Sequence, residues 1–380
     1  MSAFASALSE HPLATQAVGE TVGSILEQLD GPPDLVTLFV TAPHRGALED
    51  IARAVRQLLN PRVLVGATAV SVVGGAREVE GDPGVALFAA RFGVEIEPIR
   101  LEAFAAPDGQ FMIAGGNGLA DGRGTLLLLA DPFSFPVTEV IEHLADAVPD
   151  ITIIGGMASA AAQAGGNVLL LDDERFTDGA VGVLLPPTVP VRTVVSQGCR
   201  PIGQPMVVTR SERNMIYELA GQPALDRLMT QIDALDPDTR SLAARGLHLG
   251  IVIDESRDHF GPGDFLVRAV MGADREARAV AVGDAVEVGR TVQFQVRDAA
   301  SADDDLAALL ADATGRGALL FTCNGRGTQL FGAPHHDAAA VAEAIGGGAV
   351  AGMFCAGELG PVGGRTFLHG FTASVAIFDS

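Results

Sequence analysis

The C-terminal part of the chain contains the stretch Gly352-Met353-Phe354-Cys355-Ala356-Gly357-Glu358-Leu359-Gly360, which continues through Gly363-Gly364 into the apolar run 371–378. This order predicts a strand, a glycine-rich turn and a second strand. The same order of apolar runs and glycines occurs twice upstream, at residues 63–88 and 151–185. The stretch therefore predicts three copies of one structural unit in this chain.

An apolar run and a helical pattern precede each copy. The spacing of Leu48, Ile51, Ala52 and Val55, at i, i+3, i+4 and i+7, is typical of the buried face of a helix. The predicted pairs of strand and helix are 35–40 with 48–59, 125–130 with 137–147, and 318–321 with 338–345. Each unit is thus expected to be β-α-β-β.

These patterns predict an α/β protein with two lobes of mixed β-sheets covered by helices, built from the repeated β-α-β-β units. The repeat places Gly66, Gly155 and Gly352 at equivalent strand ends. Because any tight strand connection needs glycine, a purely structural role for the glycine-rich turns stays open. The turns after the second strand of each unit are the first candidates for a ligand site.

The charge of the chain excludes two classes of partner. Its formal net charge is −22, and its 25 basic residues are all arginines. Binding to nucleic acid or to an anionic membrane depends on cations that neutralise phosphates, so we expect neither partner. The lack of lysine excludes a Schiff-base mechanism and a P-loop lysine.

The sequence carries no signal for export or for membrane insertion. No apolar run reaches the roughly 18 to 20 residues that a membrane span requires. The N-terminal segment contains Glu10 and Glu20 where an export signal has a basic start and an apolar core. Cys199, Cys323 and Cys355 are an odd number of cysteines and are expected to be reduced thiols. We expect a soluble, cytoplasmic protein.

The densest cluster of polar residues lies in the third copy. It comprises Cys323-Asn324-Gly325-Arg326-Gly327, His335-His336-Asp337 and the segment 355–358. If the strands of this copy are neighbours, Cys323 and Cys355 lie at the same rim, where open α/β sheets bind ligands. Asp337 or a histidine is expected to cap the helix that follows.

This cluster favours an anion as ligand. Arg326, and Arg200 in the turn Gly198-Cys199-Arg200-Pro201, can hold a carboxylate bidentately, and the glycine-rich turns offer backbone N–H groups. We expect Arg326 to bind the carboxylate of an amino-acid-like ligand and Glu358 its ammonium group, with Asn324 beside them. A surface ion pair between Glu358 and Arg365 is the structural alternative.

Cysteine and histidine suggest three other kinds of site. A closed zinc site is not expected, because the chain has no C-x-x-C or H-E-x-x-H spacing. Cys323 or Cys355, with His336 or His369 as base, would make a cysteine-dependent enzyme for acyl transfer or hydrolysis. Cysteines of this kind are more often small, buried, inert thiols. Haem is not expected, because the chain has no C-x-x-C-H motif. We therefore assign no catalytic residue, metal or cofactor and favour a binding protein over an enzyme.

A set of spaced motifs together resembles the FIST proteins. The motifs are Gly198-Cys199-Arg200-Pro201-Ile202-Gly203, Gly221-Gln222-Pro223-Ala224-Leu225, Cys323-Asn324-Gly325-Arg326-Gly327 and Phe354-Cys355-Ala356-Gly357-Glu358-Leu359-Gly360-Pro361. The likeness covers the chain from about Asp34 to Phe378. It implies an N-terminal FIST lobe at residues 1–215, with two copies of the unit, and a C-terminal FIST lobe at residues 216–380, with the third.

The resemblance implies an intracellular sensory protein of signal transduction that binds a small ligand, such as an amino acid. Some relatives are haem-bound nitric-oxide sensors, so a haem-based sensor is a further alternative. No residues remain for a kinase, cyclase or DNA-binding output, and the chain looks like a stand-alone FIST protein that acts through a separate signalling output protein. The expected ligand-binding residues, at one cleft, are Cys199, Arg200, Cys323, Asn324, Arg326, Cys355 and Glu358.

Overall fold

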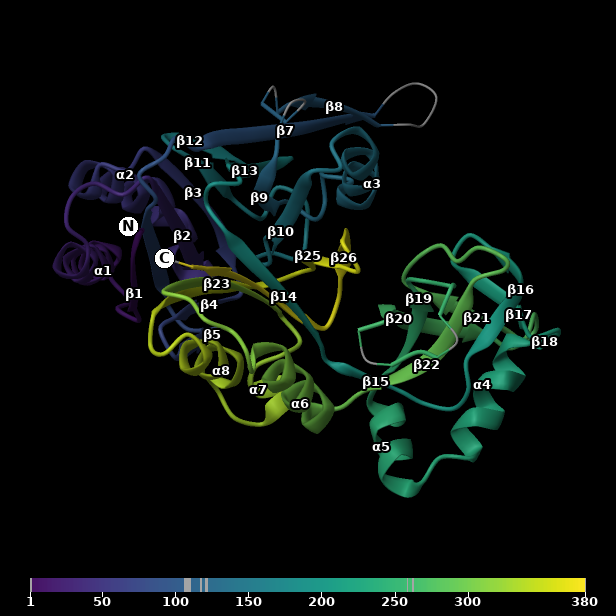
Figure 1. The fold of residues 1–380 in the computed structure, drawn as a ribbon. Coiled ribbons are helices and arrows are strands. Elements are labelled where there is room, and N and C mark those ends of the chain that lie inside the picture. Colours follow the sequence, from purple (N-terminus) through teal and green to yellow (C-terminus); the bar gives the residue numbers. More distant parts are fainter. Residues whose placement is uncertain are drawn as a thin grey trace. The chain divides into compact units, whose positions relative to one another are not determined.

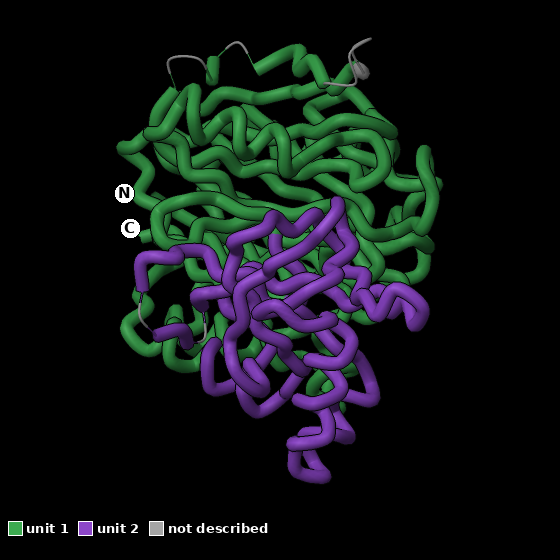
Figure 2. Tube along the Cα trace, turned by 90° about the vertical axis from the view of Figure 1, so that its right-hand side faces the viewer, with its two compact units in different colours: residues 1–195, 307–368, 372–380 green, residues 196–306, 369–371 purple. Residues whose placement is uncertain are grey.

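A computed structural model of the chain describes residues 2–105, 111–116, 118–119, 122–257, 259–261 and 263–379. The chain forms two compact units, shown in Figure 2. Unit 1 comprises Met1–Val195, Ala307–Leu368 and Thr372–Ser380, and unit 2 comprises Ser196–Leu306 and His369–Phe371. The two units are defined by contacts within the fold and not by family domains. The predicted division into two FIST lobes between residues 215 and 216 therefore stays a prediction.

In the part of the chain that the structure describes, three mixed sheets lie in unit 1 (Figure 1). In spatial order, the first contains β1 (Ala3–Ser9), β6 (Val85–Arg91), β2 (Leu35–Thr41), β3 (Val63–Ala69), β11 (Leu169–Leu171) and β12 (Glu174–Phe176). The second contains β26 (Arg365–His369), β25 (Glu358–Val362), β10 (Ile151–Met157), β9 (Gly124–Ala130), β13 (Ala180–Leu185), β7 (Glu97–Ala105) and β8 (Phe111–Gly115). The third contains β14 (Val191–Gln197), β27 (Thr372–Phe378), β23 (Gly317–Cys323), β24 (Ala349–Cys355), β4 (Ser71–Gly74) and β5 (Arg77–Glu80).

Helices join or cover these strands. They are α1 (Ala14–Gln28), the 3₁₀ helix η1 (Ala42–Ala47), α2 (Leu48–Leu59), α3 (Val137–Ala147), α6 (Ala299–Leu310), α7 (Thr328–Phe331) and α8 (His336–Ala344). Helix α2 has the predicted buried face of Leu48, Ile51, Ala52 and Val55. Its apolar side chains pack with those of α1 on one face of the first sheet. The α/β class with mixed sheets and helices, predicted from the sequence, is confirmed.

Each sheet of unit 1 contains one parallel pair of strands with a helical connection. The pairs are β2 with β3, β9 with β10, and β23 with β24. Parallel neighbours need a crossover of this length, because a hairpin turn can join only antiparallel strands. The first strand of each pair also has an antiparallel neighbour, which is β6, β13 or β27 respectively. That the three arrangements superpose as copies of one unit stays a prediction.

Three glycines lie inside the second strand of these parallel pairs and not at its end, where the sequence analysis placed them. A Cβ atom added to any of them would lie within 2.4 Å of the carbonyl oxygen of the leucine directly opposite. The distances are 2.4 Å for Gly66 with Leu38, 1.9 Å for Gly155 with Leu128 and 1.9 Å for Gly352 with Leu320. Close approach of the neighbouring strand therefore explains these glycines.

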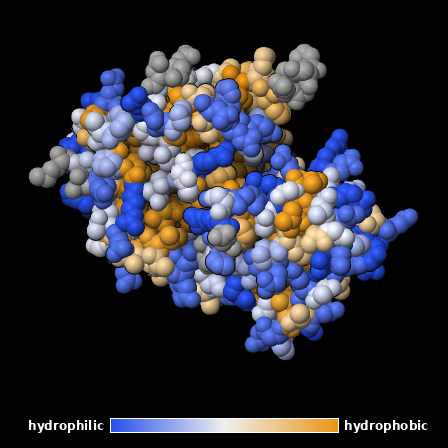
Figure 3. All heavy atoms as spheres, turned by 45° about the vertical axis from the view of Figure 1, so that its right-hand side comes forward, coloured by the Kyte–Doolittle hydropathy of each residue, from blue (hydrophilic) through white to orange (hydrophobic). Residues whose placement is uncertain are grey.

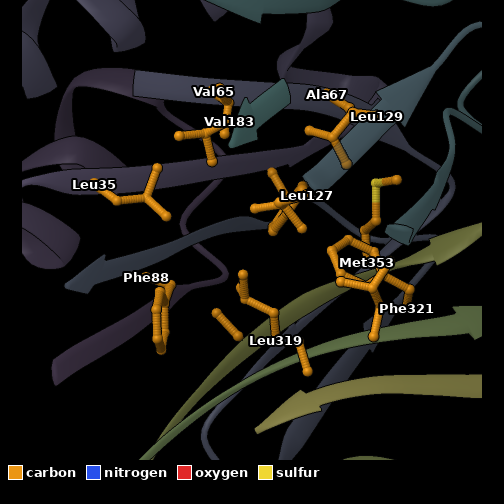
Figure 4. Packing of buried hydrophobic residues seen from close by; sticks show 14 of the residues in the cluster. Leu35, Val65, Ala67, Phe88, Leu127, Leu129, Val183, Leu319, Phe321 and Met353 are labelled. Atoms are coloured by element: carbon orange, nitrogen blue, oxygen red, sulfur yellow. The ribbon is translucent and has the colours of Figure 1, made fainter. Parts of the chain in front are cut away.

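One apolar core joins the three sheets of unit 1. Figure 4 shows Leu35 of β2, Leu127 of β9 and Leu319 of β23 turned toward a common centre. The rings of Phe88 and Phe378 stack there with their centroids 5.6 Å apart. Because each fully buried side chain of this size contributes about 1.5 to 3 kcal/mol of stability, this core holds the strands that carry the polar cluster in fixed positions.

Unit 2 contains one antiparallel sheet with strand order β15 (Cys199–Pro201), β22 (Thr291–Arg297), β16 (Met206–Glu212), β17 (Met215–Leu219), β21 (Ala279–Val282), β20 (Phe265–Asp274) and β19 (Leu247–Val252). Strand β19 pairs with β22 as well as with β20, so six of these strands form a closed ring. The short β18 (Gln222–Pro223) pairs with β17. Helices α4 (Ala224–Asp233) and α5 (Pro237–Arg245) contribute to the apolar core of this unit.

The surface mixes hydrophilic and hydrophobic residues. On the face drawn in Figure 3, hydrophilic side chains cover most of the surface and hydrophobic ones form patches between them.

Within the part of the chain that the structure describes, no helix combines the length and the apolar character that crossing a membrane requires.

Candidate functional site

The ends of β23 and β24 place two cysteines side by side. Cys323 and Cys355 are directly opposite each other as the last residues of the two parallel strands. The backbone N–H of Asn324 donates to the carbonyl oxygen of Cys355 at 2.9 Å. Both cysteines are buried, whereas Asn324 and Ala356, the next residue of each strand, are exposed. The strand ends therefore reach the surface at a rim of unit 1, as the sequence predicted.

Arg326 lies just beyond this rim and forms a buried ion pair with Asp337. Its Nε and Nη2 donate to the two carboxylate oxygens of Asp337 at 2.7 and 2.8 Å. Thr322 also donates to this carboxylate, through Oγ1 at 2.6 Å, and Nδ1 of His336 lies 3.0 Å from it. Burial alone raises the pKa of Asp337, but the charge and hydrogen bonds of Arg326 outweigh burial and hold this pKa well below its usual range.

Aromatic rings lie beside the guanidinium group of Arg326. Its Cζ is 5.2 Å from the ring centroid of Phe331, at the end of the short α7. Phe331 in turn stacks on His336, with the ring centroids 3.4 Å apart. Gly327 and Gly332, on either side of α7, have φ values of 61° and 73°, which favour glycine. The turn after β23 is thus shaped to bring an aromatic ring to a buried cation.

Two polar atoms of this cluster have no hydrogen-bond partner among the residues that the structure describes. They are Nη1 of Arg326 and Oε1 of Glu358, and both side chains are fully buried. The other carboxylate oxygen of Glu358, Oε2, accepts hydrogen bonds from the N–H and Oγ1 of Thr372 at 3.2 and 2.9 Å. A buried polar atom without a partner is unfavourable, so a donor to Glu358 and an acceptor for Arg326 are missing from the described structure.

The side chains of Arg326 and Glu358 affect each other electrostatically. Burial lowers the pKa of Arg326, but the charges of Asp337, Cys323 and Glu358 raise it, and the net shift is upward. Burial raises the pKa of Glu358 to about 8, against the opposing hydrogen bonds from Thr372 and Cys323 and the charge of Arg326. The structural alternative, a surface pair of Glu358 with Arg365, is wrong, because Glu358 is fully buried and Arg365 is exposed.

The sulfur of Cys355 is enclosed by its neighbours. Burial raises the pKa of the Cys355 thiol well above its usual value, with the charges of Glu358 and Cys323 adding to the shift. A Cβ atom added to Gly156 of β10 would lie 2.3 Å from this sulfur, so glycine makes the space that the thiol occupies. Because the thiolate and not the thiol is the nucleophile, burial of Cys355 disfavours its nucleophilic form.

The cap of α8 comes from a distant strand. Glu78 of β5 accepts hydrogen bonds from the backbone N–H groups of His335 and Ala338 at 2.8 and 3.0 Å. Its own N–H donates to Nδ1 of His335 at 2.9 Å. The expectation that Asp337 or a histidine caps this helix is wrong: Asp337 binds Arg326, and His335 at the N-cap makes no side-chain cap bond. No local signal identifies Glu78, which precedes His335 by 257 residues.

The predicted ligand-binding residues divide between the two units. Cys323, Asn324, Arg326, Cys355 and Glu358 lie in unit 1, where the geometry above brings them together.

Cys199 and Arg200 lie in unit 2. Arg200 donates through Nε to Asp298 at 2.7 Å and through Nη2 to Thr239 at 3.2 Å. Cys199 begins β15 and is directly opposite Arg297 of β22. The guanidinium of Arg200 thus has carboxylate and hydroxyl partners of its own within unit 2.

The described residues give no metal centre, and one pocket of unit 1 lies away from the cluster at Arg326. In the described ranges, no group of three or more histidine, cysteine, aspartate and glutamate side chains is arranged to hold a metal ion. A pocket of about 320 Å³ lies elsewhere in unit 1 and includes neither Arg326 nor Glu358. Its lining comes from the end of α3, the start of β10 and the β25–β26 turn, with Arg365 and Asp146 as its charged residues.

Residues 34–222 of the chain match the FIST N domain, and residues 224–361 match the FIST C domain. The chain belongs to the FIST family. FIST domains are sensory domains of signal transduction that bind small ligands. An uncharacterized protein of Mycobacterium bovis is 42% identical to this FIST protein over 374 residues, which cover 97% of this chain and 96% of that protein. An uncharacterized protein of Mycobacterium tuberculosis is 42% identical over 378 residues, which cover 98% of each chain.

Proposed function

We propose that this FIST protein is a cytoplasmic sensor that binds a small, amino-acid-like ligand at the ends of β23 and β24 and signals through a separate output protein. The observation that carries the proposal is the pair of buried atoms without partners, Nη1 of Arg326 and Oε1 of Glu358. One atom lacks an acceptor and the other lacks a donor. An α-amino acid supplies both, because its carboxylate accepts from a guanidinium and its ammonium group donates to a carboxylate.

The ion pair with Asp337 limits how Arg326 takes part in binding. Its Nε and Nη2 are engaged by Asp337, so only Nη1 is left for the ligand. The ligand carboxylate then receives one charge-assisted hydrogen bond in place of the bidentate pair that the sequence suggested. Asp337 holds the guanidinium in a fixed orientation before the ligand arrives, which lowers the entropy lost on binding.

The rim formed by Asn324 and Ala356 gives the ligand its approach to the buried atoms. Both residues are exposed, and each directly follows a buried cysteine. In this arrangement Cys323 and Cys355 are apolar wall residues beside the ligand. The raised pKa of Cys355 supports this role over that of a nucleophile, so the geometry favours binding over cysteine-dependent chemistry.

The experiment measures the melting temperature of the purified protein with each proteinogenic amino acid in turn. At least one amino acid is expected to raise it, because a ligand that binds only the folded state stabilises that state. Glu358→Gln keeps the shape of the side chain but cannot ionise to pair with the ligand ammonium group, so it should abolish the rise. Arg365→Ala, which removes an exposed arginine near the same strand, is the matched control and should keep the full rise.

Two results contradict the proposal. One is a panel in which no amino acid changes the melting temperature of the wild-type protein. The other is a stabilising amino acid that gives the same rise in the wild-type protein and in Glu358→Gln. Arg326→Ala is less suitable as a first test, because it leaves the buried carboxylate of Asp337 without its cation and destabilises the fold itself.

A further inference from the structure

Gln295, in the middle of β22, has a buried side-chain amide that makes no hydrogen bond. The residue is 1% exposed, and neither Oε1 nor Nε2 has a partner within the described part of the chain. Native proteins rarely bury an amide in this way, because desolvation of both atoms is left uncompensated.

His248 of β19 presents a second unpaired polar atom at the same place. It is directly opposite Gln295 in the antiparallel pair, so both side chains project from the same face of the sheet. Its Nδ1 is buried without a partner in the residues that the structure describes. Burial, and then the charge of Arg297, lower the pKa of His248 to about 4, so the imidazole is neutral at neutral pH. The two side chains thus lie side by side without bonding to each other.

A glycine makes room for the amide. A Cβ atom added to Gly250, two residues along β19 from His248, would lie 2.2 Å from Nε2 of Gln295 and 2.9 Å from the ring of Phe265. A side chain at this position would therefore displace the amide from the face where it meets His248. Gly250 keeps this face open in a strand whose other residues, apart from His248, are leucine, isoleucine and valine.

Phe371, an aromatic residue with a strained backbone, contacts His248. Phe371 has a φ of 64°, in the left-handed region that bulky side chains rarely adopt. Its ring meets that of His248 edge-on, with the centroids 4.3 Å apart, and Cζ of Arg297 is 5.1 Å from its centroid. The N–H of Gly198 donates to the carbonyl oxygen of Phe371 at 2.9 Å and helps to hold this conformation. Backbone strain of this kind is concentrated at ligand-binding and active sites.

We propose that Gln295, His248 and Phe371 form a second binding site, within unit 2, for a small neutral ligand that carries an amide edge. In such an edge an N–H group lies beside a C=O group, as in a carboxamide, a lactam or a nucleobase. The ligand N–H donates to Oε1 of Gln295, the ligand C=O accepts from Nε2, and a further polar atom of the ligand bonds to Nδ1 of His248. The ring of Phe371 forms a flat wall for a planar ligand.

A carboxylate fits this site less well than an amide edge. A carboxylate only accepts hydrogen bonds, so it would satisfy Nε2 of Gln295 and leave Oε1 without a donor. A neutral His248 also supplies no positive charge for an anion. The site therefore differs in chemistry from the pair of Arg326 and Glu358, and it does not depend on the function proposed for that pair.

The test measures binding of nicotinamide and of uracil to the full chain by calorimetry, with benzoate as the control that has a carboxylate in place of the amide. We expect saturable binding of at least one of the two amide probes and none of benzoate. Gln295→Leu removes both amide atoms and should weaken the binding at least about tenfold. Gly250→Ala fills the space beside the amide and should weaken it as well. Gln204→Leu, which changes an exposed glutamine of the same unit, should leave it unchanged.

Hydrogen exchange on the wild-type protein locates the probe without any variant. Protection by the probe is expected in β19, in β22 and at residues 369–371. The proposal is wrong if neither amide probe binds saturably, which would leave water alone as the partner of Gln295. It is also wrong if the probe binds Gln295→Leu as well as wild type, or if it protects other segments only.

Discussion

The guanidinium of Arg326 and the carboxylate of Asp337 form a bidentate ion pair in which neither side chain has any exposed surface. The pair ties the turn after β23 to the first turn of α8. Because Nη1 of Arg326 stays without a partner in the described structure, the pair fixes the direction in which the remaining N–H bonds point.

Removing one member of this pair should destabilise the protein strongly. Asp337→Ala leaves a buried guanidinium without its counter-ion, and we expect a loss of about 3 to 5 kcal/mol in the free energy of unfolding. Urea denaturation followed by circular dichroism measures it. The matched control is Asp50→Ala, which breaks an exposed pair with Arg53 and should change stability by less than about 1 kcal/mol. Equal losses of stability in the two variants would show that the buried ion pair stabilises the fold no more than the exposed one.

Stability should fall as the pH rises from about 5 to about 8. Burial raises the pKa of Glu78 to about 7, with the charge of Asp337 adding to it, and raises that of Glu358 to about 8. Between about pH 5 and pH 8 the folded state therefore binds more protons than the unfolded state. The free energy of unfolding falls with rising pH wherever this is so. Urea midpoints across this range measure the trend. Glu78→Gln and Glu358→Gln should each flatten it, and an unchanged slope in both variants would contradict the assignment.

An amino acid bound at the strand ends should bind more tightly at higher pH. The ammonium group of the ligand needs the ionised form of Glu358, and a pKa of about 8 leaves this carboxyl mostly protonated at neutral pH. Affinity is thus expected to rise from about pH 6 to about pH 8.5, up to the point where the ligand itself loses its proton. Titration calorimetry at several pH values tests this. A pH-independent affinity would argue against contact between the ligand and Glu358.

Gly352→Ala should destabilise unit 1 without touching any polar residue. The new Cβ atom would lie 1.9 Å from the carbonyl oxygen of Leu320, so the two strands must separate, at about 1 to 3 kcal/mol. Gly23→Ala in α1 is the control. No atom lies within 4 Å of a Cβ added there, and alanine in a helix should raise stability by about 0.5 to 1 kcal/mol. Thermal melts of both variants distinguish the effects, and a neutral Gly352→Ala would contradict the strand geometry.

Haem should not bind specifically to this chain. Haem iron needs an axial ligand in a shaped apolar pocket, and the sequence contains no C-x-x-C-H motif. Addition of haem to the purified protein should give no Soret band beyond that of non-specific binding. A sharp Soret band that disappears in His369→Ala would overturn this expectation and favour a haem-based sensor.

Local sequence patterns were enough to predict the elements that carry the site but not the partners within it. Apolar runs and helical spacing place β23, α8 and β24, and the parallel pairing puts Cys323 opposite Cys355. The role of Asp337 was missed, because its position before an apolar helix is also typical of a cap. Glu78 could not be predicted from local patterns, because it meets α8 through sheet pairing between segments more than 250 residues apart.

Glycines inside strands are a second feature that could not be interpreted correctly from the sequence. A glycine such as Gly155 reads in the sequence as a turn residue, whereas in the structure a neighbouring carbonyl oxygen excludes any side chain there. The closed ring of unit 2 was not predicted at all. Its closure depends on the pairing of β19 with β22, and neither strand carries a signal for its second neighbour.

Because β22 closes the ring, the order in which the strands are synthesised matters for the folding of unit 2. Among the strands of the ring it is the last to leave the ribosome, and it pairs with β15, β16 and β19. Until Thr291–Arg297 emerges, β16 and β19 each have an unpaired edge, to which another nascent chain could add a strand. The arrival of those seven residues covers both edges at once. A translational pause before residue 291 would therefore leave both of these strand edges uncovered.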